Sequence, residues 1–146
     1  MTAIHTEKAF EEFIQAHLTA HGWLKGSDTD FDPTLGLDRG HLFAFIEATQ
    51  PDTWAQLRKS HGADLEAKVT DTLAKHLETQ GTLHVLRHGF KFYGKQLDTA
   101  VFKPAHGLNP KVEAQYAANR LVVTRQVHYD AQSGDTRAFT EVVRRF

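Results

Sequence analysis

Apolar side chains recur at three- or four-residue spacing through the first half of the chain, which predicts a series of amphipathic helices. The first helix is expected over residues 6–21, with Thr6 as its N-cap and Gly22 just after its last turn. Its helically spaced positions hold Phe10, Phe13, Ile14, His17, Leu18 and His21. A loop is expected over residues 25–38, because aspartate, glycine, serine and proline favour turns there.

Further helices are expected between residues 38 and 81. Asp38 suits the N-cap of one short helix, and Pro51 suits the first turn of the next. A longer helix fits residues 64–80, and Gly81 would end it. The side chains expected to face a core are Leu42, Phe43, Phe45, Ile46, Trp54, Leu57, Leu65, Val69, Leu73 and Leu77.

The residue types change after Gly81. Residues 83–101 are richer in β-branched and aromatic side chains, which favours irregular strands. A short helix is expected from Asn109 to about Ala118. The best strand covers residues 120–129, and its shared face would hold Leu121, Val123, Val127 and Tyr129. The pattern therefore predicts an α/β chain with a helical part over about residues 1–81 and a strand-containing part over about 82–146.

The composition narrows the class of protein. Hydrophobic residues make up 40% and charged residues 24%, which is typical of soluble globular chains. The sequence contains no cysteine, which excludes a disulfide or a cysteine zinc site. A net charge of −1 means that any DNA contact needs a local basic patch. No signal-peptide core or bilayer-length apolar run is present, so we expect a cytoplasmic protein without membrane partners.

Two motif-like segments favour ordinary structural interpretations. Residues 89–96 nearly match a phosphate-binding loop, but Gln96 stands where a Mg²⁺-binding hydroxyl is needed. A strand, a turn and a second strand, with Lys91 and Lys95 in solvent, is the stronger interpretation. Glu66 and Lys68 have the Glu-x-Lys spacing of nucleases, yet on a helix these side chains diverge. A solvated helix face is expected there.

Histidine pairs and one basic–aromatic segment remain as candidate binding features. His17/His21 and His84/His88 have the spacing of a helical metal site, without a matched third ligand. Surface or half-buried histidines are the stronger expectation. Lys91, Phe92, Tyr93 and Lys95 could contact nucleic acid, and packing of the aromatic rings in a core is the open alternative.

Several longer segments of the sequence carry a family resemblance. They are residues 6–12 with Gly22 and Trp23, then 31–33, 48–54, 83–91, 102–110 and 116–129. Together these segments, which cover about residues 5–130 and fall in family order, resemble the N-terminal region of the restriction (R) subunit of type I restriction enzymes. Any one segment alone would be a weak match, but the set taken together is specific.

The resemblance implies a PD-(D/E)xK endonuclease fold with a mixed sheet. In that family an ATP-driven DNA translocase follows the endonuclease domain. The subunit works with methylation and specificity subunits and cleaves unmodified DNA, using Mg²⁺. By resemblance, Glu11 is the expected supporting carboxylate and Glu7 the second choice; an exposed helix carboxylate is the open alternative for both. Lys91, Lys95, Arg120 and Arg125 are the expected DNA-binding residues.

The sequence departs from the family after residue 130. The catalytic Asp is expected near Ala138, whereas Asp135 comes three residues early and Glu141 lacks the following x-Lys. We therefore expect a truncated, catalytically incomplete fragment of marginal stability, with no complete metal site and no tight binding of Mg²⁺ or ATP. A truncated or frame-shifted gene, a natural remnant and an excerpt of a longer protein are all open explanations of this departure. The alternative function is a non-catalytic module that docks onto the motor or methyltransferase subunits.

Overall fold

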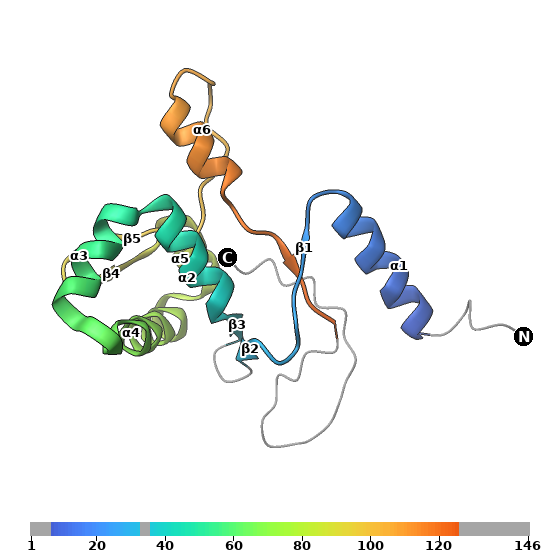
Figure 1. Ribbon diagram of the computed structural model, residues 1–146, viewed down its shortest axis with the longest axis horizontal. Helices are drawn as coiled ribbons and strands as arrows, with labels where there is room; N and C mark the ends of the chain where they lie inside the picture. The colour runs from blue at the N-terminus through green and yellow to red at the C-terminus, as the bar shows by residue number, and fades with distance from the viewer. Residues whose placement is uncertain (1–6, 33–35, 126–146) are drawn as a thin grey trace, which may run out of the picture. The chain divides into compact units, whose positions relative to one another are not determined.

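The computed structural model describes residues 7–32 and 36–125, which form a mixed α/β structure that is mostly helical (Figure 1). These residues divide into two compact units. The first unit holds the described residues up to Asp38 together with residues 120–125, and the second holds Arg39–Asn119. The second unit is therefore an insertion, in sequence, between two segments of the first.

The first unit begins with helix α1, Glu7–Ala20. Gly22 has a φ of +92°, and the Trp23 amide donates a hydrogen bond to the Leu18 carbonyl at 3.1 Å, so the helix ends where predicted. Thr6, the expected N-cap, lies outside the described residues. Strand β1, Leu24–Lys25, follows at once and runs parallel to β6, Val122–Val123, with Leu24 opposite Val122 (Figure 1).

The segment expected to be a plain loop contains short strands. Strands β2, Phe31–Asp32, and β3, Leu37–Asp38, pair antiparallel, and Phe31 opposes Asp38. Phe31 and Leu37 are buried, which explains why a segment rich in turn residues still forms a ladder. The loop prediction was therefore wrong at residues 31–32 and 37–38.

The apolar stripe of α1 does not face a core. Phe10 and Phe13 are 64% and 69% exposed, while Ile14 and Leu18 are half-buried. Glu11 is instead the buried residue of this helix. Helical periodicity predicted the helix, but the orientation that it implied was wrong.

The second unit opens with the three expected helices. They are α2, Arg39–Thr49, α3, Pro51–His61, and α4, Leu65–Gln80, with a 3-10 turn at Gly62–Asp64 before α4. The predicted core positions that are buried are Leu42, Phe45, Ile46, Trp54, Leu57, Leu65, Val69 and Leu73. Phe43 and Leu77 are half-buried, and the Phe43 ring stacks on Trp54 at 5.6 Å.

The expectation of strands from residue 83 was wrong for its first part. Thr82–His88 forms helix α5, with Val85 buried. Gly81 and Gly89 have φ values of +84° and +64° and delimit this helix. Only the following segment is extended, as the hairpin of β4, Phe90–Phe92, and β5, Lys95–Leu97.

Side-chain hydrogen bonds connect the remaining segments of the second unit. Helix α6, Pro110–Ala117, has Asn109 as its N-cap, and the Asn109 side chain accepts from Lys111 N at 3.1 Å. The Asn119 amide brackets the Val101 backbone, accepting from its N–H at 2.9 Å and donating to its carbonyl at 2.6 Å. Gln115 donates to the Thr49 carbonyl at 3.1 Å, which attaches α6 to α2.

The described part of the predicted 120–129 strand is short, and its alternation was wrong. Val122 and Val123 are both buried, whereas Leu121 is 43% exposed. Strands buried on both faces lack the inside–outside alternation on which that prediction relied. Val127 and Tyr129 lie outside the described residues. Within residues 7–32 and 36–125, no helix is long and apolar enough to cross a membrane.

Candidate functional site

Glu11 and Arg125 form a salt bridge in the first unit. The Arg125 Nε donates to the Glu11 Oε2 at 3.2 Å, although the two residues are 114 positions apart in the sequence. The Glu11 side chain is 2% exposed and that of Arg125 is 21% exposed. The pair joins α1 to the segment that follows β6.

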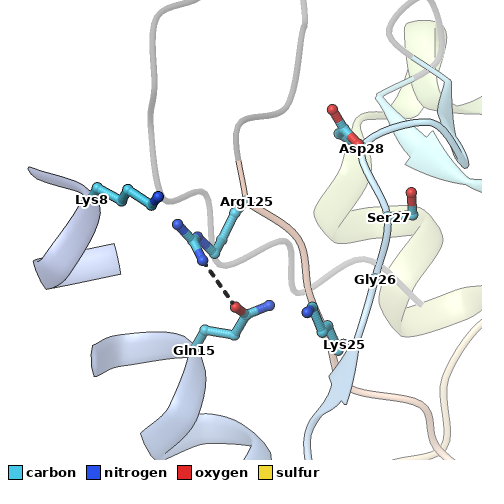
Figure 2. Close-up of a pocket in the computed structure, with 7 residues that line it drawn as sticks. All are labelled: Lys8, Gln15, Lys25, Gly26, Ser27, Asp28 and Arg125. Atoms are coloured by element: carbon cyan, nitrogen blue, oxygen red, sulfur yellow. Dashed lines mark hydrogen bonds between the residues drawn. The ribbon is translucent and has the colours of Figure 1, made fainter. Parts of the chain in front are cut away.

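Helix α1 orients the guanidinium through further contacts. Gln15, one helical turn after Glu11, accepts a hydrogen bond from Arg125 Nη1 at 3.3 Å (Figure 2). Glu12 Oε1 lies 3.9 Å from Nη2, and its side chain is 53% exposed, so solvent weakens this contact. Glu11 and Gln15 therefore fix the direction of the guanidinium.

The buried carboxylate depends on its partner. Glu11 Oε1 is buried and has no hydrogen-bond partner within the described residues. A buried carboxylate is strongly disfavoured unless a cation and hydrogen bonds compensate its charge. Arg125 supplies that compensation at Oε2, and Oε1 remains an acceptor that a cation or a hydrogen-bond donor would satisfy.

A pocket lies beside this salt bridge. Its volume is about 520 Å³, which falls in the range of small-ligand sites. Figure 2 shows Lys8, Gln15 and Arg125 on one side, and Lys25, Ser27 and Asp28 from β1 and the segment after it on the other. Three cationic side chains and one carboxylate thus line a pocket in which a phosphate could replace solvent.

Gly26 holds the β1 side of the pocket in place. Its amide donates to the Val123 carbonyl at 2.9 Å. A Cβ at this position would clash with the Thr124 side chain and lie 2.8 Å from Val122 Cγ1. Only glycine therefore allows the segment between Lys25 and Ser27 to approach β6 this closely.

The structure brings together two of the predicted site residues, both in the first unit. Glu11 and Arg125 are in contact, and the alternative of an exposed carboxylate was wrong for Glu11. Glu7 is exposed on α1, as that alternative expected, and Arg120 is half-buried in the first unit. Lys91 and Lys95 are exposed on β4 and β5 of the second unit.

Other members of the site were missed in the sequence. Gln15, Lys25 and Ser27 belong to no recognisable motif, and Lys8 lies in the family-like segment 6–12 but was not selected as a site residue. Gln15 left a geometric signal, because it stands four positions after Glu11 on the same helix face. The others become neighbours only through the long-range pairing of β1 with β6.

Within residues 7–32 and 36–125, no three histidine, aspartate or glutamate side chains are grouped closely enough to hold a metal ion. Glu11 is already engaged by Arg125. Ala138, Asp135 and Glu141, on which the expected catalytic carboxylates depend, lie outside the described residues.

Each of the two predicted histidine pairs brings two imidazole rings together. The His17 and His21 rings are 4.4 Å apart, and His21 Nδ1 lies 2.7 Å from the His17 carbonyl oxygen. His84 and His88 are 4.8 Å apart on α5. All four are exposed, as the surface interpretation expected.

The two motif-like segments also have the ordinary structures expected of them. Residues 89–96 form the start of a hairpin with Lys91 and Lys95 exposed. Glu66 and Lys68 lie exposed on α4, and Glu66 pairs with Arg58 at 3.0 Å. Neither segment forms a phosphate-binding loop or a strand-borne Glu-x-Lys.

Comparisons of the chain with family models, curated proteins and solved structures found no match. The function proposed for the chain therefore rests on its own residues.

Proposed function

We propose that this chain forms the N-terminal part of a type I restriction subunit, within a PD-(D/E)xK endonuclease domain, and that its first unit contacts the phosphates of DNA. The observation that carries the proposal is the Glu11–Arg125 salt bridge. The resemblance selected Glu11 as a supporting carboxylate, and Arg125 was among the residues expected to bind DNA. Their contact supports a shared role.

The pocket beside the pair supplies suitable chemistry for a phosphodiester. Arg125 can present parallel N–H groups to two phosphate oxygens, and Lys8 and Lys25 add charge. Ser27 adds a hydroxyl donor. Glu11 and Gln15 act as positioning residues, because they contact the guanidinium and hold its direction.

Cleavage needs more than this pocket offers. Metal-dependent phosphodiester hydrolysis uses a cation held by more than one carboxylate, which activates water and stabilises the transition state. No three acidic or histidine side chains lie together so as to hold a metal ion among residues 7–32 and 36–125. The sequence also departs from the family near Ala138, and Glu141 lacks the following x-Lys. We therefore expect the chain to bind DNA without cleaving it. In the proposed family, ATP and Mg²⁺ are used by the whole subunit together with its methylation and specificity partners.

A binding assay tests the proposal. Fluorescence anisotropy with a labelled DNA duplex at low salt should show binding that Arg125→Ala weakens about tenfold. The salt dependence should also become shallower, because a phosphate contact is lost. Lys68→Ala on the solvated face of α4 is the matched control and should bind like the wild type. Equal affinity of Arg125→Ala and wild type for the duplex would overturn the phosphate-binding role.

A plasmid-nicking assay with Mg²⁺ tests the expected lack of cleavage. Robust nicking that Glu11→Ala abolishes would show that the chain carries a complete active site. That result would contradict the assignment of Glu11 as a positioning residue.

One observation favours the second candidate, a non-catalytic docking module. Phe10 and Phe13 are exposed side by side on α1, as apolar contact residues of a protein interface would be. In this alternative the chain binds the motor or methylation subunits of the same enzyme class. Pull-down with those purified subunits tests it, and Phe10→Ser with Phe13→Ser should abolish capture.

A further inference from the structure

The tip of the β4–β5 hairpin has an unusual residue in its turn. Tyr93 and Gly94 form the two-residue connection, with φ values of +48° and +76°. This geometry belongs to turns that favour asparagine, aspartate or glycine at both positions. A bulky side chain with positive φ is strained, and such strain concentrates at functional positions.

Tyr93 is also the most exposed aromatic ring of the hairpin. It is 71% exposed, whereas its neighbour Phe92 is fully buried. The two rings meet edge to face at 4.8 Å. The His61 ring, at the end of α3, lies 4.6 Å from Tyr93 and 5.2 Å from Phe92. A buried ring and a histidine thus support Tyr93 from within the unit while most of it stays open to solvent.

The charged side chains of the hairpin are all positive. Residues 89–97 carry Lys91 and Lys95 and no carboxylate. Lys91 lies opposite Gln96 and Lys95 opposite Phe92, so a lysine stands on each strand close to the turn. Both lysines are exposed. An open aromatic ring flanked by cations suits a ligand that combines flat apolar groups with negative charge.

We propose that this hairpin tip binds single-stranded nucleic acid, with an unpaired base stacked on Tyr93 and the flanking phosphates held by Lys91 and Lys95. Single strands expose base faces beside a charged backbone, and aromatic stacking with lysine contacts is how proteins bind them without reading sequence. A duplex hides its base faces and matches the tip less well. The site lies in the second unit and does not depend on the proposed role of Glu11 and Arg125.

The test uses labelled (dT)12, (U)12 and a DNA duplex, with anisotropy measured on the full chain at low salt. Wild type should bind a single strand more tightly than the duplex. Tyr93→Asn should weaken single-strand binding about tenfold or more, since one stacked base is lost. Tyr93→Phe should retain it, because stacking needs the ring and not the hydroxyl. The ratio of affinities for (dT)12 and (U)12 separates DNA from RNA as the preferred strand.

The Tyr93→Asn variant also distinguishes a loss of binding from a loss of the folded structure. Asparagine suits the turn better than tyrosine, so Tyr93→Asn should unfold at the same or a higher temperature while binding is lost. Tyr116→Ala, at a 41% exposed tyrosine on α6, is the matched control and should bind like wild type.

Two results would overturn the inference: unchanged single-strand affinity in Tyr93→Asn, or no wild-type binding to either single strand. The second result would point to a protein as the partner of the tip. Arg125→Ala should reduce duplex binding and leave single-strand binding unchanged, so failure here and failure of the proposed function are distinguishable.

Discussion

The positive charge of the Arg125 guanidinium compensates the negative charge of the Glu11 carboxylate, which is almost completely removed from solvent. The two partners are unequal, because Arg125 retains 21% exposure and Glu11 only 2%. Without Glu11, the arginine can turn to water. Without Arg125, the glutamate keeps a buried charge that nothing else among its described contacts offsets.

This inequality predicts asymmetric stability effects. Arg125→Ala should lower the free energy of unfolding by about 3 kcal/mol, since breaking a buried pair leaves an uncompensated charge. Glu11→Gln should lower it by only about 1 kcal/mol, because the glutamine carbonyl oxygen can still accept from Arg125 and only the charge of the acceptor is lost. Urea denaturation followed by circular dichroism measures both. Equal losses in the two variants would contradict the dependence of Glu11 on Arg125.

The close approach of Gly26 to β6 predicts a second effect. Gly26→Ala should destabilise the first unit by about 1–3 kcal/mol, because the added methyl group overlaps Thr124 and Val122. Gly107→Ala is the control, since there the methyl group meets only the movable end of Glu113 at 3.1 Å. Its effect should stay within about 0.5 kcal/mol. A tolerated Gly26→Ala would mean that β1 and β6 are not paired in this register.

The exposure of Phe10 and Phe13 predicts that removing them costs little. Each change to alanine should alter the free energy of unfolding by about 0.5 kcal/mol or less, as for other surface positions. Leu42→Ala, at a fully buried position of α2, should cost about 2–5 kcal/mol by comparison. Losses of several kcal/mol at Phe10 or Phe13 in thermal or urea unfolding would show that the stripe of α1 is buried after all.

The cap of α6 gives a fourth prediction. Asn109→Ala removes the acceptor for the amides of Lys111 and Val112 and should destabilise the second unit by about 1 kcal/mol. Asn109→Asp preserves an acceptor at the cap and should restore most of that loss. Thermal unfolding of the pair measures the difference, and indistinguishable midpoints for the two variants would argue against the cap.

Local sequence patterns were sufficient to predict the first helices of the second unit, α2, α3 and α4. Leu65, Val69 and Leu73 repeat every four residues and are all buried on α4, and Pro51 and Gly81 delimit helices as expected. The same reasoning failed for α5, where the β-branched and aromatic content of residues 83–101 had suggested strands. Gly81 and Gly89 delimit a seven-residue helix there, and residue preferences over so short a segment are weak.

The candidate site was only partly accessible from the sequence. The resemblance selected Glu11, and Arg125 was expected to bind DNA, but nothing local indicated that they touch, because their contact spans 114 residues. The hydrophobic pattern of α1 placed Phe10 and Phe13 inside and Glu11 outside, and the pairing of α1 with the β6 segment reverses this. Lys8 and Lys25 join the pocket through the same long-range pairing, which periodicity cannot detect.

The parallel pairing of Leu24 with Val122 determines the order in which the two units can fold during synthesis on the ribosome. The first unit needs a strand that is made about a hundred residues after helix α1, whereas Arg39–Asn119 is continuous in sequence. The inserted unit can therefore fold while the chain is still growing, and α1 must wait for its strand to emerge. During that interval the Glu11 carboxylate stays hydrated.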